Sequence, residues 1–506
     1  MGTRRQFGRE TVSEKMWRFR GILVVVSVPL FLVLAVVTLM PTAPSDGLDF
    51  SSRGHVRDRM LDQRRVGSGV PNSSRDVESA RGTRLTPSTG VAFIAQAQNS
   101  ADADTEGRKY AVVFDAGSTG SRVHVFRFDL RRDGELALMD DTFQQLKPGL
   151  SSFAASPTEG ADSLKPLLEL AMRTVPAAAR AGTTVAVRAT AGLRLLPGEQ
   201  AHELLRAVEK LLNEYPFQIN HGSVSIMDGA EEGAFQWLTM NYLLGNLRGD
   251  LGSTVATVDL GGGSVQLAYA ADKKHVATAP DGYFKEMKSG DFSYHVYVYS
   301  HLGFGLMAAR AAVLAVADGD ASPCVPAGHV GEYTYAGKTH KAVGHDSQPA
   351  DAVKCKAVVD TVLDPAAPCE VQTQENCAFA GAWDGARGAG ATAFYLSSYL
   401  FDRVSQAGLV DPAEPSGKTT PGEILVAATR ACAMTPAQVL TQFHGVAETD
   451  AAYYCHDLSY AHSLLVVGYR LAEDAEVTLV KQVVYKGQKI EAAWPLGAAI
   501  NALSVS

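Results

Sequence analysis

Short hydrophobic runs that flank a polar, glycine-rich turn mark the start of the folded part of this chain. Residues 110–114 read YAVVF, the turn DAGSTGSR follows at 115–122, and a second apolar run, VHVFRF, occupies 123–128. β-Branched and aromatic residues in runs of this length are typical of buried strands. The pattern therefore predicts a strand that ends at Asp115, a tight turn and a returning strand.

The same pattern recurs further along the chain. Residues 254–258 (TVATV) predict a strand, DLGGGS at 259–264 predicts the turn, and 265–269 (VQLAY) predict the returning strand. Asp259 follows Asp115 by 144 residues, which is the length of a domain. One glycine-rich turn alone is most simply a hairpin. Two Asp-x-Gly hairpins at this spacing instead predict two related α/β lobes.

Helical periodicity dominates the segment between the two turns. Apolar residues recur at helical intervals over 161–180 and 199–215, and the strand-like run 183–188 lies between them. A third helix is expected near residue 228, with Asp228 as its N-cap and Glu231 completing a capping box. This alternation of strands and helices predicts the α/β class.

The N-terminal 108 residues have a different pattern. Residues 21–40 form an uncharged apolar run of 20, long enough to span a bilayer, and six Lys or Arg precede it against two Glu. This charge asymmetry predicts a cytoplasmic tail (1–20), an uncleaved signal anchor (21–40) and a flexible stem (41–108), with a cleaved signal peptide as the alternative. We therefore expect a single-pass type II membrane protein of the Golgi or plasma membrane, whose catalytic domain is lumenal or extracellular. Asn72 would be a glycosylation acceptor there.

The six cysteines fit that compartment. An even number of cysteines on the oxidising side of a membrane predicts disulfides, although six cysteines allow fifteen connectivities. A zinc site is the alternative, but no CxxC spacing occurs. We expect the local pairs that close the shortest loops: Cys324–Cys355, Cys369–Cys377 and Cys432–Cys455.

Composition narrows the class of protein. The 506 residues allow two to four domains, and the 46% hydrophobic content excludes disorder over most of the chain. The net charge of −8 argues against a basic face that binds nucleic acid, so no nucleic-acid partner is expected.

The two turns carry groups that suit phosphate chemistry. Glycine permits close approach of the backbone to a ligand, and successive N–H groups form a nest for anions. A carboxylate at the end of the preceding strand can hold a metal ion through water. Glu232 has no evident structural role, unlike Glu231, and is a candidate general base for activating water.

Five segments in order resemble the apyrase family, the nucleoside triphosphate diphosphohydrolases. They are DAGSTGSR (115–122), ATAGLRLLP (189–197), DGAEEGAFQWLTMNYLLG (228–245), DLGGGSVQLA (259–268) and AAWPLGAAI (492–500). The last segment and GAWDGARG (381–388) are most similar to the plant-type apyrases. The resemblance implies a two-lobed, actin-like and sugar-kinase-like ATPase fold made of duplicated ribonuclease-H-like lobes. The N-terminal lobe would span 109–250, with a return near 470–506, the C-terminal lobe would span 251–470, and the nucleotide would bind in the cleft between them.

The resemblance also implies a reaction and its residues. Nucleoside tri- and diphosphates would be hydrolysed to monophosphate and phosphate with Ca²⁺ or Mg²⁺. Glu232 would be the base, Ser264 and Gln266 would position the water, and Asp115 and Asp259 would organise the metal through its water shell. The other implied phosphate- or nucleotide-binding residues are Gly117, Ser118, Thr119, Gly120, Arg122, Thr190, Arg194, Gly261, Gly262 and Gly263. Tyr460 is expected to stack on the base, with Tyr399 or Phe401 as second choices.

Alternatives remain open at this stage. The expected substrates are ATP, ADP, GDP and UDP, and a Golgi diphosphatase that prefers GDP or UDP is one alternative to a surface apyrase. A kinase or exopolyphosphatase of the same superfamily is another, although a lumenal domain and the Glu232 base favour hydrolysis. A non-catalytic receptor for nucleotides or glycans is the third.

Overall fold

The computed structural model describes residues 107–504, apart from 118–119, 132–133, 197, 370–376 and 386–389. The predicted tail, membrane anchor and nearly all of the stem lie outside this part, as do Asn72, Ser118 and Thr119. Within the described residues, no helix has the length and apolar character needed to cross a membrane.

The first sheet is built around the first predicted hairpin. Its strand order is β3-β2-β1-β4-β5; β1, β2 and β3 are antiparallel neighbours, whereas β1, β4 and β5 run parallel. The strands are β1 (Arg108–Ala116), β2 (Ser121–Leu130), β3 (Leu136–Leu146), β4 (Thr184–Ala189) and β5 (Val224–Ile226). The carboxyl ends of the parallel strands thus meet beside the turn that follows Asp115.

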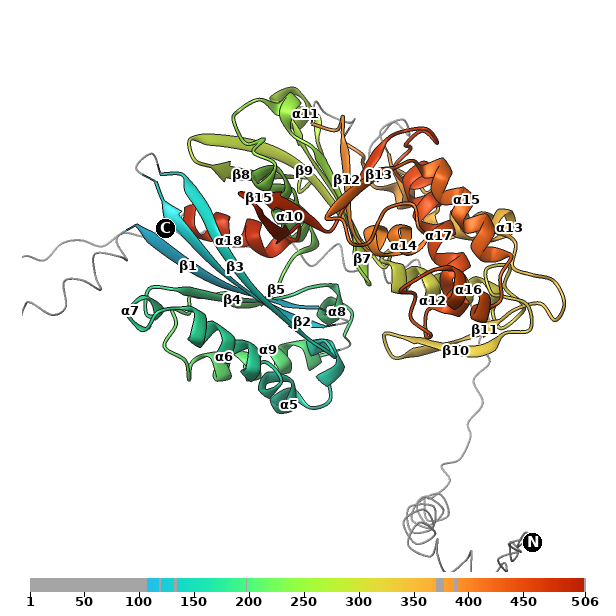
Figure 1. Ribbon diagram of the computed structural model, residues 1–506, viewed down its shortest axis with the longest axis horizontal. Coiled ribbons are helices and arrows are strands. Elements are labelled where there is room, and N and C mark those ends of the chain that lie inside the picture. Colours follow the sequence, from blue (N-terminus) through green and yellow to red (C-terminus); the bar gives the residue numbers. More distant parts are fainter. Residues whose placement is uncertain are drawn as a thin grey trace, which may run out of the picture. The chain divides into compact units, whose positions relative to one another are not determined.

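Helices cover both faces of this sheet (Figure 1). One face packs on α5 (Pro157–Asp162), α6 (Lys165–Thr174) and α9 (Gln200–Leu212) through one continuous apolar core. The helical pattern over 161–180 gives separate short helices, ending with α7 (Ala177–Arg180), because Pro166 and Pro176 each start a new helix. The opposite face packs on α10 (Gly229–Leu243) and on α18 (Trp494–Ser504).

The second sheet repeats the first with two added edge strands. Its order is β13-β14-β12-β6-β7-β9-β8, and the inner part, β9-β7-β6-β12-β14, has the same antiparallel and parallel neighbours as the first sheet. The strands are β6 (Ala256–Leu260), β7 (Ser264–Ala271), β8 (Phe284–Ser289), β9 (Phe292–Leu302), β12 (Phe394–Ser398), β13 (Ser416–Thr419) and β14 (Val477–Val480). This repeat confirms the two-lobed α/β fold with duplicated lobes.

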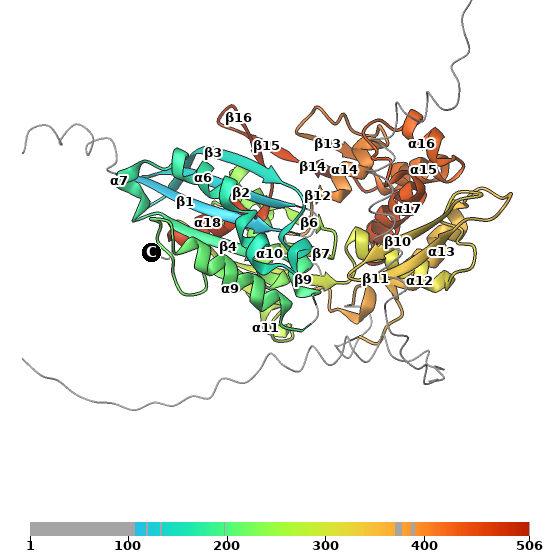
Figure 2. The ribbon, with the colours of Figure 1, turned by 90° about the horizontal axis from the view of Figure 1, so that it is seen from below.

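The helices of the second lobe gather on one face of its sheet (Figure 2). They are α12 (Leu306–Ala317), α13 (Ala352–Leu363), α14 (Tyr399–Gln406), α15 (Pro421–Cys432), α16 (Pro436–Gln442) and α17 (Tyr454–Ser463). A hairpin of β10 (Val330–Tyr335) and β11 (Lys338–Val343) packs on α12. The remaining elements are α8 (Ala191–Arg194), α11 (Lys273–Thr278), β15 (Gln482–Tyr485) and β16 (Gln488–Glu491).

Local disulfides and one shared core hold these elements together. The three predicted disulfides, Cys324–Cys355, Cys369–Cys377 and Cys432–Cys455, are confirmed. Helix α10 contributes to a core that includes strands of both sheets, and α18 packs on α10 and β1. The C-terminal segment thus contacts the first sheet, whereas the exact lobe boundaries stay predictions.

Candidate active site

The two aspartates occupy equivalent positions in the two sheets. Asp115 lies near the end of β1 and Asp259 near the end of β6, and each is only 8% exposed. Burial raises the pKa of Asp259, and the negative charge of Asp115 adds to that rise. The duplicated hairpins therefore bring two buried carboxylates within electrostatic reach of each other, one from each lobe.

The second turn has the form of an anion nest. The N–H of Gly261 donates to the carbonyl of Ser264 at 3.0 Å, which closes the turn. The carbonyls of Gly261, Gly262 and Gly263 all accept N–H groups from residues 303–308, at the start of α12. Because C=O and N–H point in opposite directions across a trans peptide, the N–H groups of Gly262 and Gly263 point away from α12. They have no acceptor in the described part of the chain and suit phosphate oxygens.

Gly305 is what allows α12 to approach this turn. A Cβ at residue 305 would overlap the backbone of Gly262 and Gly263. The N-terminus of α12 therefore lies directly behind the nest, where its positive end favours an anion.

The first turn is closed in the same way. The N–H of Gly117 donates to the carbonyl of Gly120 at 3.1 Å. Arg122 donates from Nη1 to Oδ2 of Asp115 at 2.7 Å and also lies in the field of Glu491. Arg122 is therefore paired with Asp115, a partner that the resemblance did not suggest.

Asp115 retains one oxygen for another partner. Its Oδ1 is buried and accepts no hydrogen bond. Carboxylate oxygens are the donors that Mg²⁺ and Ca²⁺ prefer, and Mg²⁺ in particular is commonly bound through one or two carboxylates, water and substrate phosphates. Asp115 and Asp259 therefore fit a divalent cation bound through its water shell. No group of three or more His, Cys, Asp or Glu in the described residues is placed to hold a metal ion.

Asp259 is held by two serines that the sequence did not reveal. Ser397 and Ser398, at the end of β12, donate to Oδ1 of Asp259 at 3.1 and 2.5 Å. Ser398 has a φ of +59°, a region that non-glycine residues adopt at a cost of about 1–3 kcal/mol. The surrounding structure imposes this conformation and so aims the hydroxyl at Asp259.

Glu232 lies in the first turn of α10 and is 9% exposed. Nη2 of Arg194, in α8, lies 2.5 Å from Oε2 of Glu232, and Nε2 of Gln266 lies 3.4 Å from the same oxygen. Burial raises the pKa of Glu232 to about 7. Arg194 opposes this rise, whereas the charges of Asp259 and Asp115 add to it. A general base works best when its pKa lies near the working pH.

The neighbouring Glu231 lies in solvent, unlike the buried Glu232. It is exposed, and the expected capping box does not form, because the N-cap Asp228 makes no side-chain cap bond. Asp228 instead lies 3.7 Å from Lys285. Helical geometry therefore separates two adjacent glutamates, one facing solvent and one facing the hairpins.

Gln266 connects Glu232 to the second turn. Its Nε2 lies 2.7 Å from Oγ of Ser264 and 2.9 Å from Oγ of Ser300, in addition to its contact with Glu232. Gly233 permits this approach, since a Cβ there would lie 3.0 Å from Cβ of Gln266. The predicted water-positioning residues thus share one polar cluster with the predicted base, and Ser300 is an additional member.

Thr190 and Arg194 form the link between the first sheet and Glu232. The N–H of Thr190 donates to the carbonyl of Ala116 at 3.4 Å, and Thr190 is the N-cap of α8. Arg194 ends that short helix and reaches Glu232. The structure therefore gives Arg194 a defined position beside Glu232.

The expectation for Tyr460 is not supported by the structure. Its ring is fully buried in the core of the second lobe, stacked on His456, and its hydroxyl donates to the carbonyl of Phe304 at 2.5 Å. Phe401 is also a core residue. Tyr399, at the start of α14, is only partly buried and interacts electrostatically with Arg122. Of the three aromatic residues expected to stack on the base, Tyr399 is the one that interacts with a residue of the first turn.

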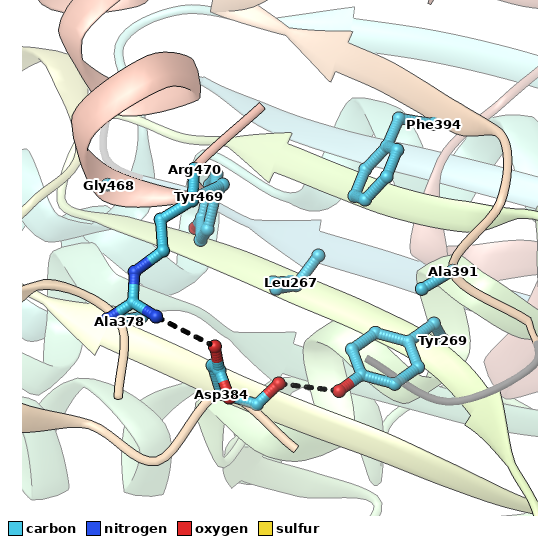
Figure 3. Close-up of a pocket in the computed structure, with 9 residues that line it drawn as sticks. All are labelled: Leu267, Tyr269, Ala378, Asp384, Ala391, Phe394, Gly468, Tyr469 and Arg470. Atoms are coloured by element: carbon cyan, nitrogen blue, oxygen red, sulfur yellow. Dashed lines mark hydrogen bonds and ion pairs between the residues drawn. The ribbon is translucent and has the colours of Figure 1, made fainter. Parts of the chain in front are cut away.

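A separate cavity lies in the second lobe, between β7, β12 and the segment after α17 (Figure 3). Asp384 and Arg470 lie 3.7 Å apart in it, and the hydroxyl of Tyr269 donates to the carbonyl of Asp384 at 2.6 Å. None of the predicted site residues lines this cavity. This cavity is therefore separate from the cluster around Glu232.

Two glycine-rich turns at equivalent positions of duplicated lobes, with a buried carboxylate of raised pKa in the field of both aspartates, are the arrangement expected of an enzyme that acts on phosphoryl groups. The sequence profile of the GDA1/CD39 (nucleoside phosphatase) family matches residues 101–506, and the chain belongs to this family. It is 40% identical over 510 aligned residues to "Probable apyrase 1" of Oryza sativa subsp. japonica, which covers 98% of this chain and 96% of the relative. It is 41% identical to "Apyrase 1" of Arabidopsis thaliana over 409 residues, covering 78% and 85% of the two chains.

A solved structure supports the fold independently. The crystal structure of nucleoside triphosphate hydrolases from Neospora caninum superposes with a TM-score of 0.57, covering 80% of this chain and 95% of that chain. At 15% sequence identity, this likeness bears on the two-lobed fold alone.

Proposed function

We propose that this chain is an apyrase that hydrolyses nucleoside tri- and diphosphates to monophosphate and phosphate. The observation that carries the proposal is the buried carboxylate of Glu232, held by Arg194 and Gln266 beside two phosphate-binding turns. The names of the relatives, probable apyrase and apyrase, support the same reaction.

The chain's own residues suggest how the reaction proceeds. The N–H groups of Gly262 and Gly263 hold oxygens of the terminal phosphate, and Gln266 and Ser264 hold a water molecule beside Glu232. The ionised carboxylate of Glu232 accepts a proton from this water as the water oxygen attacks phosphorus, and the shortened nucleotide leaves. Arg194 favours the ionised form that this step requires.

A divalent cation, Ca²⁺ or Mg²⁺, completes the proposed site. It would neutralise charge on the phosphate oxygens, and Asp115 and Asp259 would hold its water shell. Support comes from the unpartnered Oδ1 of Asp115 and from the oxygen-only donor set. Tyr399 is our choice for stacking on the nucleotide base, since Tyr460 is buried.

We also propose that residues 21–40 anchor the enzyme in the Golgi or plasma membrane, with the catalytic domain lumenal or extracellular. This proposal is supported by the sequence pattern of the N-terminal segment alone.

The test is phosphate release by the full-length chain. ATP, ADP, GDP, UDP and AMP are each supplied with Ca²⁺, with Mg²⁺ or with EDTA. The proposal predicts phosphate release from the tri- and diphosphates, none from AMP, and loss of release with EDTA. Transfer of phosphate to an acceptor without free phosphate would indicate a kinase. Nucleotide binding without any release would indicate a receptor, and either result would contradict the proposal.

A further inference from the structure

The tip of the β10–β11 hairpin reaches the second phosphate-binding turn. The hydroxyl oxygen of Tyr335, the last residue of β10, lies 3.0 Å from the position that a Cβ would occupy on Gly263. Cβ of Ala191, from α8, lies 2.9 Å from the same position. Three elements that are distant in sequence, α8, β10 and the turn after β6, therefore meet at Gly263.

The hairpin is fixed to the same helix that supports the turn. The hydroxyl of Tyr333 donates to the carbonyl of Met307 at 3.0 Å, and the N–H of Met307 donates to the carbonyl of Gly262 at 3.0 Å. Both Tyr333 and Tyr335 are on the half-buried face of β10, which packs on α12 (Figure 1). Met307 thus joins the hairpin and the turn into one unit, so the position of Tyr335 relative to Gly263 is well defined.

The two tyrosines differ in how their hydroxyls are used. That of Tyr333 has a backbone acceptor, whereas that of Tyr335 makes no hydrogen bond to any residue that the structure describes. Burial raises the pKa of Tyr335 to about 12, so this hydroxyl keeps its proton at neutral pH. It is therefore an available donor beside the free N–H groups of Gly262 and Gly263.

Resting on the proposed function, we propose that the Tyr335 hydroxyl donates a hydrogen bond to an oxygen of the substrate's terminal phosphate. The hydroxyl would act together with the N–H groups of Gly262 and Gly263. Tyr335 would thus be a phosphate-binding residue outside the five segments that resemble the family. A hydrogen bond to a charged acceptor is stronger than one between neutral groups. Losing it should weaken the binding of a nucleoside diphosphate about tenfold or more.

The test uses full-length Glu232→Gln protein, in which turnover is blocked and binding can be measured by calorimetry. Tyr335→Phe is added to it, with Tyr333→Phe as the matched control, because each change removes one hydroxyl and keeps the ring. For Tyr335→Phe we expect a Kd for ADP that is about tenfold or more higher, an unchanged Kd for AMP and an unchanged Tm. For Tyr333→Phe we expect mainly a lower Tm, with a rise in the Kd for ADP that is clearly smaller than in Tyr335→Phe, because the Tyr335 hydroxyl is kept and only one attachment of its hairpin is lost.

Other results would overturn the inference. Unchanged ADP affinity in Tyr335→Phe, or a lower Tm without a change in affinity, would mean that the hydroxyl only packs against the turn. Equal weakening of ADP and AMP would place the contact on the nucleoside. If the Glu232→Gln protein binds no ADP and the wild-type chain releases no phosphate, the proposed function fails as well. If the wild type releases phosphate and Tyr335→Phe gives one of these contrary results, only the role of Tyr335 is rejected.

Discussion

The charge of Arg194 should set the pH at which the enzyme becomes active. Glu232 must be ionised to accept a proton, and its pKa of about 7 already includes the lowering effect of Arg194. Replacing Arg194 with Met keeps much of the bulk but removes the cation. The pKa of Glu232 should then rise further, so the acid limb of the kcat/KM profile should move to higher pH.

The size of the shift follows from the geometry. Nη2 of Arg194 lies 2.5 Å from Oε2 of Glu232, and the two side chains are 13% and 11% exposed. Each charge is shared over several atoms, so the charge centres lie farther apart than the closest atoms, at about 4 Å. At an effective dielectric of about 20 they interact by roughly 4 kcal/mol, which corresponds to about three pKa units. Measured shifts beside an opposite charge are about one to three units. At pH 7, kcat/KM should therefore fall between about 5-fold and about 500-fold, and it should recover at higher pH.

The assay is initial-rate phosphate release from ADP between about pH 5.5 and about pH 9.5, since kcat/KM reports the free enzyme. Arg188→Gln is the control, because Arg188 lies on β4 in the same lobe and bonds instead to Gly222 and Ser225. Its profile should match that of the wild type. A loss in Arg194→Met that is equal at every pH would mean that Arg194 acts on the substrate and not on the charge of Glu232.

Three further predictions concern the supports of the site. Ser398→Ala removes a hydrogen bond to Asp259 and should raise the cation concentration that gives half-maximal activity about tenfold, measured by titrating the cation. An unchanged half-maximal concentration would mean that Asp259 does not help to hold the cation. Gly305→Ala places a methyl group against the backbone of the second turn and should lower both Tm and kcat; a fully active variant with the parental Tm would contradict this packing. Replacing both Cys432 and Cys455 with Ala removes a disulfide between residues 23 positions apart in the sequence. The free energy of unfolding, measured with denaturant, should fall by about 3 kcal/mol. An unchanged denaturation midpoint would show that this disulfide does not stabilise the fold.

The sequence predicted those parts of the site that depend on local pattern. A strand that ends in Asp and turns at glycine is a local feature, so the hairpins at Asp115 and Asp259 could be placed before the structure was known. The choice of Glu232 over Glu231 depended on a capping box at Glu231 that does not form. The two residues differ instead because adjacent residues on a helix point in different directions. The structure places Glu231 in solvent and Glu232 in a buried cluster.

The parts that depend on sheet register were missed. Ser397 is opposite Asp259 across parallel strands, and Ser300 is opposite Gln266 across antiparallel strands. Neither pairing can be read from one sequence, because each joins segments whose order in the sheet is set by the whole fold. For Tyr460, the sequence instead predicted a ligand contact that the structure does not support. Its motif context suggested a ligand contact, but packing of α17 against α15 and α13 places the ring in the core.

If Glu232 activates the attacking water, its replacement by Gln must lower kcat at saturating ADP. Glu231→Gln is the matched control, because it makes the same change on an exposed neighbour. We expect Glu232→Gln to bind ADP but to lose about 10²–10⁴ in kcat, and Glu231→Gln to keep the parental kcat. A kcat for Glu232→Gln within a few-fold of the wild type would show that Glu232 is not the base.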